Sequence, residues 1–470
     1  MKNFRHKTSP WLSVLLTLLI SQHAFAFDAG EHAIIGDVAY ADFEKVFPNQ
    51  IRNLEANISF SYGQLIAMSA DMYVSVEEIS LDDPGFFNGF FHRNRNSLKK
   101  CINKEIEAIR TKAHYSGCDD LDFAKKKLQY VTLAHDNYGH FAWHNIKQYI
   151  ELHEKALWFA QLAYLKCTEQ QKLDSKKDCD ERNSKLEKMV SESDYRNKQK
   201  SKYRRLPKLF PRKRFTKRYF LNMPKDKMIR LALFTNAFAD HYLTDAFSAG
   251  HLRVPRSQID KFVEVYDNKE ATKKRNKGSS VSGALTQYLH NLDGSLTGIN
   301  VVNSLGDKFV VRSDKQLFSK HNSRELSGIV EDNPQLSFPI RATQASLGEI
   351  FRVIEKGEQA APKNNFSALQ FVPFVENPTE DSLSLRVASH IEQHGSIKKA
   401  IKSMSSEMQL VYKSSMAIDD ISYKEYFKNF VDSIPEMMKE LRGQIAVETK
   451  NKELRKRIPK SLLSALKTLN

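Results

Sequence analysis

Apolar residues recur at three- and four-residue spacing over most of this chain, which is the pattern of amphipathic α-helices. Short apolar alternations with glycines are confined to 298–318, where a loop or small hairpin is expected. Helices are predicted from residue 31 onward and over 54–71, 123–164 (two helices), 231–249, 281–290, 343–357, 383–393, 397–413, 423–447 and 454–469. The pattern therefore predicts an all-α, multi-helix fold.

The most informative helix begins by residue 231 and contains the sequence Asn236-Ala-Phe-Ala-Asp-His241-Tyr-Leu-Thr-Asp245, with Gly250 and His251 following. His241 and Asp245 stand four residues apart, so a helix places both side chains on one face. Gly250 is a stop signal, and a loop beyond it can bring His251 back to the same place. Imidazoles and a carboxylate that converge in this way are suitable ligands for zinc. The alternative is a buried His–Asp hydrogen bond with His251 on the surface.

Other histidines and carboxylates could join this site. His32 falls in the first turn of the first predicted helix, and its alternative is an exposed position. Asp71 follows an apolar turn, where an unpaired charge is costly, so it is either a ligand or a residue at a surface helix end. His290 and Asp293, three residues apart, share a helix face.

Three further histidines crowd the segment 133–144, namely His135, His140 and His144. His140 and His144 are four residues apart in a stretch predicted to be helical, so they too would share a face. Histidine enrichment in an apolar helix indicates metal binding, and one of the three is expected to be a ligand.

The first 26 residues have the features of a secretory signal peptide. Three basic residues precede an apolar run over 11–20, and Ala24-Phe-Ala26 fits an A-x-A cleavage site. The run is too short to span a membrane, and no later stretch reaches the required length. We therefore expect a mature protein that starts at Phe27 and is secreted or periplasmic.

Four cysteines remain in the expected mature chain, and an even number in an oxidising compartment predicts two disulfides. We favour the local pairs Cys101–Cys118 and Cys167–Cys179, each closing a polar, looped segment. Thiolate ligation of zinc is the weaker alternative, because the sequence has no C-x2-C pair.

The formal net charge is +16, which favours polyanionic partners such as anionic lipid surfaces, nucleic acid or phosphorylated substrates. Much of the basic character lies in an insertion over about 166–227, above all in 196–218. This insertion is either a solvated surface loop or a contact for a phosphate-rich surface. The sequence has no internal repeat, G-x-G-x-x-G, P-loop or G-x-S-x-G motif.

In their order, the candidate ligands resemble those of the zinc-dependent phospholipase C / single-strand nuclease superfamily of secreted, all-α, trinuclear zinc phosphoesterases. The shared order is the mature N-terminal residue, His, Asp, His, His-x3-Asp-x5-His, and a His with a nearby acid, and it spans about 27–303. The resemblance implies one zinc held by Asp71, His140, His241 and Asp245, a second by His251, His290 and Asp293, and a third by the amine and carbonyl of Phe27, His32 and Asp245. His135 is the runner-up to His140.

The segment Ala-Asp-His-Tyr-Leu-Thr-Asp-Ala-Phe-Ser-Ala-Gly-His-Leu-Arg most resembles the bacterial phospholipase C branch. That branch implies a secreted zinc metallophospholipase C, which cuts glycerophospholipids to diacylglycerol and a phosphorylated headgroup by metal-activated hydroxide attack on phosphorus. Asp71 would also orient or deprotonate the nucleophile. Arg253 and Arg256 would contact the phosphate, or else lie on the surface. The expected partner is a phospholipid membrane surface, with no obligate protein partner.

Two other functions stay open. One is a single-strand nuclease or 3′-nucleotidase on the same three zincs. The other is a non-catalytic, lipid- or membrane-binding secreted protein with structural zinc, which a closed coordination set would favour. We expect the phosphodiesterase domain to occupy 27–364 and a helical C-terminal region of unknown role to occupy 365–470.

Overall fold

The computed structural model describes residues 29–52, 54, 58–73, 75–80, 88–111, 137–192, 217–270, 278–294, 298–312, 334–403 and 423–470. Several sequence predictions fall outside these residues: the signal peptide, Phe27, His135, Cys118 and most of the basic stretch 196–218.

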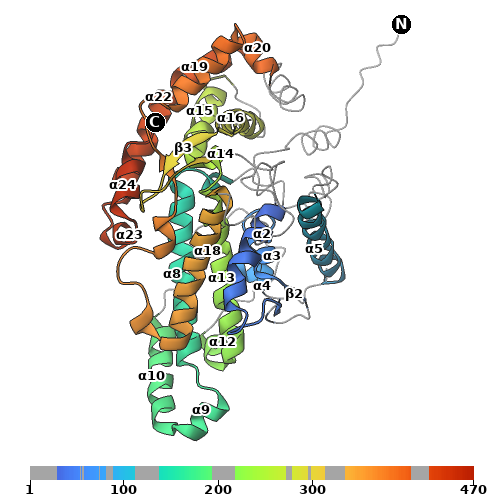
Figure 1. Ribbon diagram of the computed structural model, residues 1–470, viewed down its shortest axis with the longest axis vertical. Helices are drawn as coiled ribbons and strands as arrows, with labels where there is room; N and C mark the ends of the chain where they lie inside the picture. Colours follow the sequence, from blue (N-terminus) through green and yellow to red (C-terminus); the bar gives the residue numbers. More distant parts are fainter. Residues whose placement is uncertain are drawn as a thin grey trace.

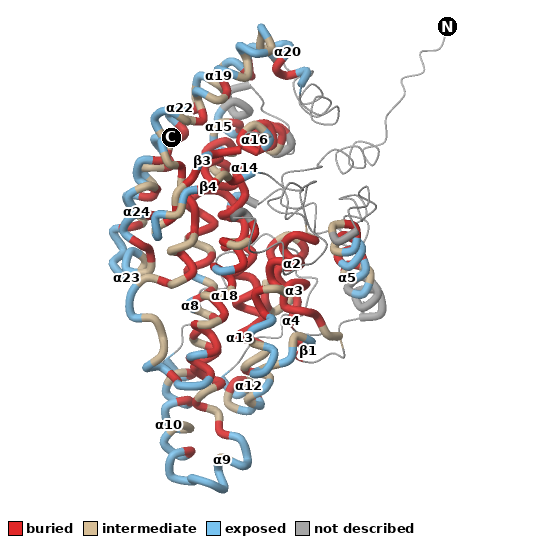
Figure 2. The backbone as a smooth tube through the Cα atoms, viewed as in Figure 1, coloured by how far each residue is buried: buried red, intermediate tan, exposed pale blue. Residues whose placement is uncertain are grey.

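Three long helices form the centre of the described structure: α8 (Trp143–Leu165), α13 (Lys225–Asp245) and α18 (Pro334–Lys356). Helices α2 (Ala29–Tyr40) and α3 (Tyr62–Met68) pack against this group, as Figure 1 shows. Helix α13 is buried from residue 231 to residue 241, including the polar residues Thr235, Asn236 and Asp240, because other helices enclose it. The buried core therefore follows α13 and its neighbours (Figure 2), and the predicted all-α fold is confirmed.

The segment 54–71, predicted as one helix, is helical only in its second part. Strands β1 (Ile51–Arg52) and β2 (Ser59–Phe60) form an antiparallel pair, and α3 begins afterwards. Ser61 and Gln64 form a capping box, which satisfies free backbone N–H groups and fixes where α3 begins. The N-terminal part is completed by η1 (Ala41–Phe43), α4 (Val76–Ser80) and α5 (Asn88–Thr111).

The insertion that begins near residue 166 is mostly helical where the structure describes it. It contains α9 (Glu169–Asp174), α10 (Lys176–Glu192) and α12 (Lys217–Asn222). Cys167 and Cys179 form the predicted disulfide, but Cys179 lies in α10, so the looped segment expected between them is wrong. A capping box at Thr168 and the Asp178–Arg182 pair explain why these polar residues form helices. Cys101 is also disulfide-bonded.

Beyond α13, the chain forms α14 (Ala249–Leu252), α15 (Arg256–Glu270) and α16 (Gly278–Asp293). The hairpin expected within 298–318 is present as β3 (Ile299–Val302) and β4 (Lys308–Val311). Strand β5 (Phe374–Val375), from the C-terminal region, pairs with the opposite edge of β3. The C-terminal region therefore completes a sheet that begins in the preceding part of the chain.

The remaining elements are η3 (Glu358–Ala360), η4 (Ser367–Gln370), α19 (Leu383–Gln393), α20 (Ile397–Lys402), α22 (Tyr423–Glu448), α23 (Lys452–Lys456) and α24 (Lys460–Lys467). The single helix predicted over 454–469 is interrupted at Pro459, which cannot donate a backbone hydrogen bond and instead starts α24. Among the described helices, none has the length and apolar composition needed to cross a bilayer.

Candidate metal centre

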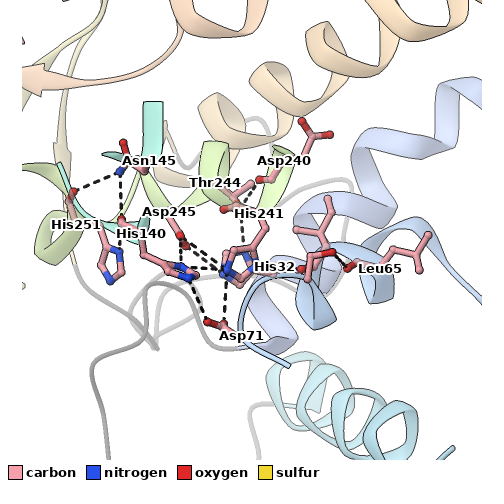
Figure 3. Close-up of polar contacts among 12 residues, drawn as sticks. His32, Leu65, Asp71, His140, Asn145, Asp240, His241, Thr244, Asp245 and His251 are labelled. Atoms are coloured by element: carbon pink, nitrogen blue, oxygen red, sulfur yellow. Dashed lines mark hydrogen bonds and ion pairs between the residues drawn. The ribbon is translucent and has the colours of Figure 1, made fainter. Parts of the chain in front are cut away.

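Five of the predicted ligands meet at the C-terminal end of α13. They form two overlapping sets that share His241, and within each set the candidate donor atoms lie within 4.8 Å of one another. One set is His32, Asp71 and His241, and the other is His140, His241 and Asp245. We call these five residues the His/Asp cluster. Figure 3 shows them converging from α2, the turn after α3, the segment before α8 and α13 itself. This cluster could hold a metal ion.

Helix α13 supplies the two central side chains. His241 and Asp245 lie on one face, with 3.8 Å between His241 Nε2 and Asp245 Oδ2, as the four-residue spacing predicts. Both are fully buried. The helix ends at Asp245, and His251 lies beyond it on the short helix α14. The predicted stop at Gly250 is wrong, because α13 already ends at Asp245 and Gly250 lies within α14.

His140 joins the cluster from a 3-10 turn, η2 (Asn137–His140). Ala142 has a φ of 50°, and this left-handed residue separates the turn from α8. His140 and His144 therefore do not share a helix face, contrary to the sequence prediction. The His144 ring lies apart, with Nε2 3.3 Å from the hydroxyl of Ser257.

Asp71 comes from the turn that follows α3. Ala70, with a φ of 61°, lies in this turn, and Asp71 N–H bonds back to the carbonyl of Ser69. The Asp71 carboxylate lies 3.8 Å from His140 Nε2 and 3.6 Å from His241 Nε2. Its side chain is 13% exposed, whereas those of His241 and Asp245 are at 0%. Asp71 therefore forms the accessible side of the cluster.

Backbone carbonyls fix the proton positions on two imidazoles. His241 Nδ1 lies 3.0 Å from the carbonyl oxygen of Ile66, and His251 Nδ1 lies 2.8 Å from that of His140. A carbonyl oxygen can only accept, so each Nδ1 must carry a proton and donate it. Burial lowers the pKa of His241 to about 4, and it lowers that of His251 well below its usual value. Both rings are therefore neutral at pH 7, and each Nε2 presents a lone pair.

The lone pair of His241 Nε2 faces other electron-rich atoms. Carboxylate oxygens of Asp71 and Asp245 lie 3.6 Å and 3.8 Å away. His140 Nδ1, at 3.3 Å, is the nitrogen of that ring that carries the proton. The one short contact in the cluster is a 2.7 Å hydrogen bond from His140 Nδ1 to Asp245 Oδ2. Burial lowers the pKa of His140 to about 3, so this ring adds no positive charge at pH 7.

The carboxylate of Asp245 lacks a positive partner among the described residues. Its Oδ1 atom is buried without a hydrogen-bond partner there, and it lies 3.5 Å from His32 Nε2. Burial raises the pKa of this carboxyl group to about 7. A buried anion among neutral imidazoles is costly unless a cation compensates it. The donor set and its charge therefore fit a bound divalent ion.

The predicted second zinc set is arranged differently. The rings of His251 and His290 are 5.1 Å apart, and His251 Nε2 is buried without a hydrogen-bond partner among the described residues. A Cβ on Gly250 would lie 2.0 Å from the His290 ring, so only glycine permits this approach. Asp293, however, accepts two hydrogen bonds from Arg253, at 2.9 Å and 2.8 Å. Both carboxylate oxygens of Asp293, a predicted metal ligand, thus accept hydrogen bonds from the Arg253 guanidinium.

Arg253 and Arg256, the predicted phosphate contacts, are both buried and bonded to other side chains, so the alternative of a surface position is wrong. Arg253 is 0% exposed and also bonds Asp381, which in turn pairs with Arg386. We call Arg253, Asp293, Asp381 and Arg386 the Arg253 cluster. Arg256, at 2% exposed, bonds Ser282, Thr286 and Asp260. Both arginines therefore connect buried parts of the fold.

The sequence analysis missed the groups that orient the imidazoles. Two of them are the backbone oxygens of Ile66 and His140, which have no signature in a sequence. The third is the hydroxyl of Thr244, 2.8 Å from His32 Nδ1. In the sequence, the feature that could have identified Thr244 is its position next to Asp245, inside the His-x3-Asp motif.

Comparison of this chain with protein-family models, with curated proteins and with solved structures finds no match.

Proposed function

We propose that this protein is a zinc-dependent phosphodiesterase of the phospholipase C type. In this proposal, the His/Asp cluster holds zinc, and the substrate is a glycerophospholipid cut on the diacylglycerol side of its phosphate. The observation that carries the proposal is the convergence of the His241 Nε2 lone pair with carboxylate oxygens of Asp71 and Asp245. When Asp245 is ionised, a lone pair and two carboxylates face one another here, and a bound cation would stabilise this arrangement.

The donors fit zinc in type and spacing. Imidazole nitrogens and carboxylate oxygens are common zinc ligands, and the N–H of a zinc-binding histidine is usually donated to a carbonyl or carboxylate. Two ligand atoms about 2.0–2.1 Å from one tetrahedral zinc lie roughly 3.3 Å apart. The separations from His241 Nε2 to the carboxylate oxygens of Asp71 and Asp245, 3.6 Å and 3.8 Å, are close to this value.

The exposed part of Asp71 favours a catalytic site over a closed structural one. Zinc, when bound, supplies a Lewis acid that activates water near neutral pH and offsets charge that builds up on a phosphate. Asp71 accepts a proton from the attacking water or holds it in line with phosphorus. His140, His241 and Asp245 keep the donor atoms fixed, and their burial excludes bulk water from the opposite side.

The choice of a phospholipid rests on the resemblance of the ligand order to bacterial phospholipase C and on the net charge of +16, which favours anionic surfaces. Single-stranded nucleic acid carries the same phosphodiester group, so a test of this function must also measure cleavage of nucleic acid.

The test begins with metal analysis of the purified protein, followed by zinc titration of the chelator-treated form. A hydrolysis panel then compares short-chain phosphatidylcholine, long-chain phospholipid vesicles and single-stranded DNA. We expect bound zinc and release of diacylglycerol. Cleavage of DNA without lipid turnover would replace the proposal with the nuclease. Tightly bound zinc without any hydrolysis would indicate a structural centre, and the absence of zinc binding would overturn the proposal.

A further inference from the structure

Thr244 is a buried hydroxyl that contacts the His/Asp cluster without belonging to it. It lies on α13 and is 0% exposed. Its Oγ1 atom lies 2.8 Å from the carbonyl oxygen of Asp240 and 2.9 Å from that of His241. On its other side, the same atom lies 2.8 Å from His32 Nδ1, which comes from α2 (Figure 3).

Counting protons assigns the direction of these bonds. A threonine hydroxyl has one proton to donate and lone pairs with which to accept. Both helix carbonyls can only accept, so the hydroxyl proton points toward them and a lone pair points toward His32. The bond to His32 is then made by a proton on Nδ1. We propose that Thr244 is a positioning residue that holds His32 in the Nδ1–H form, with the Nε2 lone pair directed at Asp245.

This inference rests on the proposed zinc site, because it gives His32 the ring form that a metal ligand needs. A neutral imidazole binds metal only through the nitrogen that lacks a proton. His32 Nε2 lies 3.5 Å from Asp245 Oδ1, an oxygen without a hydrogen-bond partner among the described residues. Thr244 therefore does for His32 what the backbone carbonyl of Ile66 does for His241.

Packing also restrains His32, and Thr244 adds a constraint that packing does not supply. A Cβ on Gly63 would lie 1.8 Å from the carbonyl oxygen of Ala33, so this glycine lets α3 pack directly against the backbone beside His32. The His32 and His241 rings stack with centroids 4.5 Å apart and an angle of 25°. Stacking sets the plane of the ring, but it does not decide which nitrogen carries the proton. The hydrogen bond to Thr244 does.

The test replaces Thr244 with valine, which has nearly the same shape and no hydroxyl. Thr235→Val is the matched control: Thr235 is 0% exposed on the same helix, and its hydroxyl bonds the carbonyl of Leu231 at 2.7 Å. Thr244→Ser restores the hydroxyl. Loss of a partner that orients a ligand typically costs about 10–100-fold in metal affinity, so T244V should lose that much while T235V and T244S stay within about threefold of wild type.

A second readout needs no metal. Solid-state ¹⁵N NMR of histidine-labelled, metal-free protein, assigned against a His32→Gln spectrum, reports which ring nitrogen of His32 is protonated. Wild type and T244S should show Nδ1–H, and T244V should gain the Nε2–H form. Wild-type protein with Nε2–H would overturn the inference even if T244V failed to fold, and so would T244V matching T235V in both readouts. If wild type binds no zinc, the proposed function fails, and the NMR result still decides the role of Thr244.

Discussion

The His/Asp cluster and the Arg253 cluster each contain a buried carboxylate, Asp245 and Asp293, that the sequence predicted to bind zinc. In the Arg253 cluster, Asp293 meets a guanidinium at 2.8 Å and 2.9 Å. In the His/Asp cluster, Asp245 meets imidazoles of lowered pKa and has one oxygen without a hydrogen bond among the described residues. One carboxylate is neutralised by the chain itself, and the other is not.

The difference shows how a buried carboxylate reveals its role. An anion paired with arginine holds parts of the fold together, and removal of either partner leaves an uncompensated charge. An anion surrounded by neutral imidazoles has no opposite charge beside it, and a cation can supply the missing stabilisation. Substitutions in the two clusters should therefore have opposite consequences for stability and for metal binding.

The largest effect is expected from Asp245→Asn, which keeps the side-chain volume and removes the charge. Enzymes typically accelerate their reactions by about 10⁶-fold or more, and loss of the metal centre should remove at least about 10⁴ of this, or roughly 5.5 kcal/mol. Zinc content should fall with activity. The thermal midpoint of the metal-free variant should equal or exceed that of metal-free wild type, because a poorly compensated buried carboxylate is gone. A lower midpoint would place Asp245 among the structural carboxylates.

Asp293→Asn should show the reverse pattern. It leaves Arg253 buried with a weaker partner, and breaking a buried ion pair costs about 3–5 kcal/mol. Urea denaturation of the metal-free variant should report this loss, while the zinc content of the His/Asp cluster stays at the wild-type level. Loss of one zinc without destabilisation would instead return Asp293 to the ligand role that the resemblance implied.

The pH dependence of zinc affinity should test whether Asp245 is the carboxylate that the fold leaves uncompensated. Burial raises the pKa of Asp245 to about 7, so in the metal-free protein a proton competes with the metal below that pH. Zinc affinity should therefore weaken by about tenfold per pH unit, or about 1.4 kcal/mol, as the pH falls from 7 toward 5. The metal-induced rise in thermal midpoint, measured across this range, should shrink accordingly. A constant rise would mean that Asp245 is already ionised without metal.

Arg386→Met should give the smallest change. Arg386 and Asp381 form the outer part of the Arg253 cluster, with side chains 19% and 25% exposed. Partly exposed pairs contribute about 0.5–1 kcal/mol, and salt weakens them. Urea denaturation at low and high salt should show a small loss that shrinks with salt. A loss as large as that of Asp293→Asn would mean that the cluster acts as one unit.

The sequence by itself determined what is local. Helical spacing put His241 and Asp245 on one face of α13, and the i,i+4 rule needs no tertiary information. It also identified the helical fold and the Cys167–Cys179 pair, because both depend on short-range patterns and composition. Where the local pattern was ambiguous, at 54–71 and at Pro459, caps and proline decided the helix limits.

Only the tertiary structure decided which distant groups meet. His32 lies 212 residues from Thr244, and Asp293 lies 40 residues from Arg253, so neither contact follows from helix periodicity. The ligand order suggested that Asp293 binds metal, but packing brought a guanidinium to both of its oxygens. Likewise, a backbone carbonyl can fix an imidazole proton wherever the chain passes, and no residue type marks that place. A carboxylate's role depends on the charge that the folded chain brings to it, and that charge comes from elsewhere in the sequence.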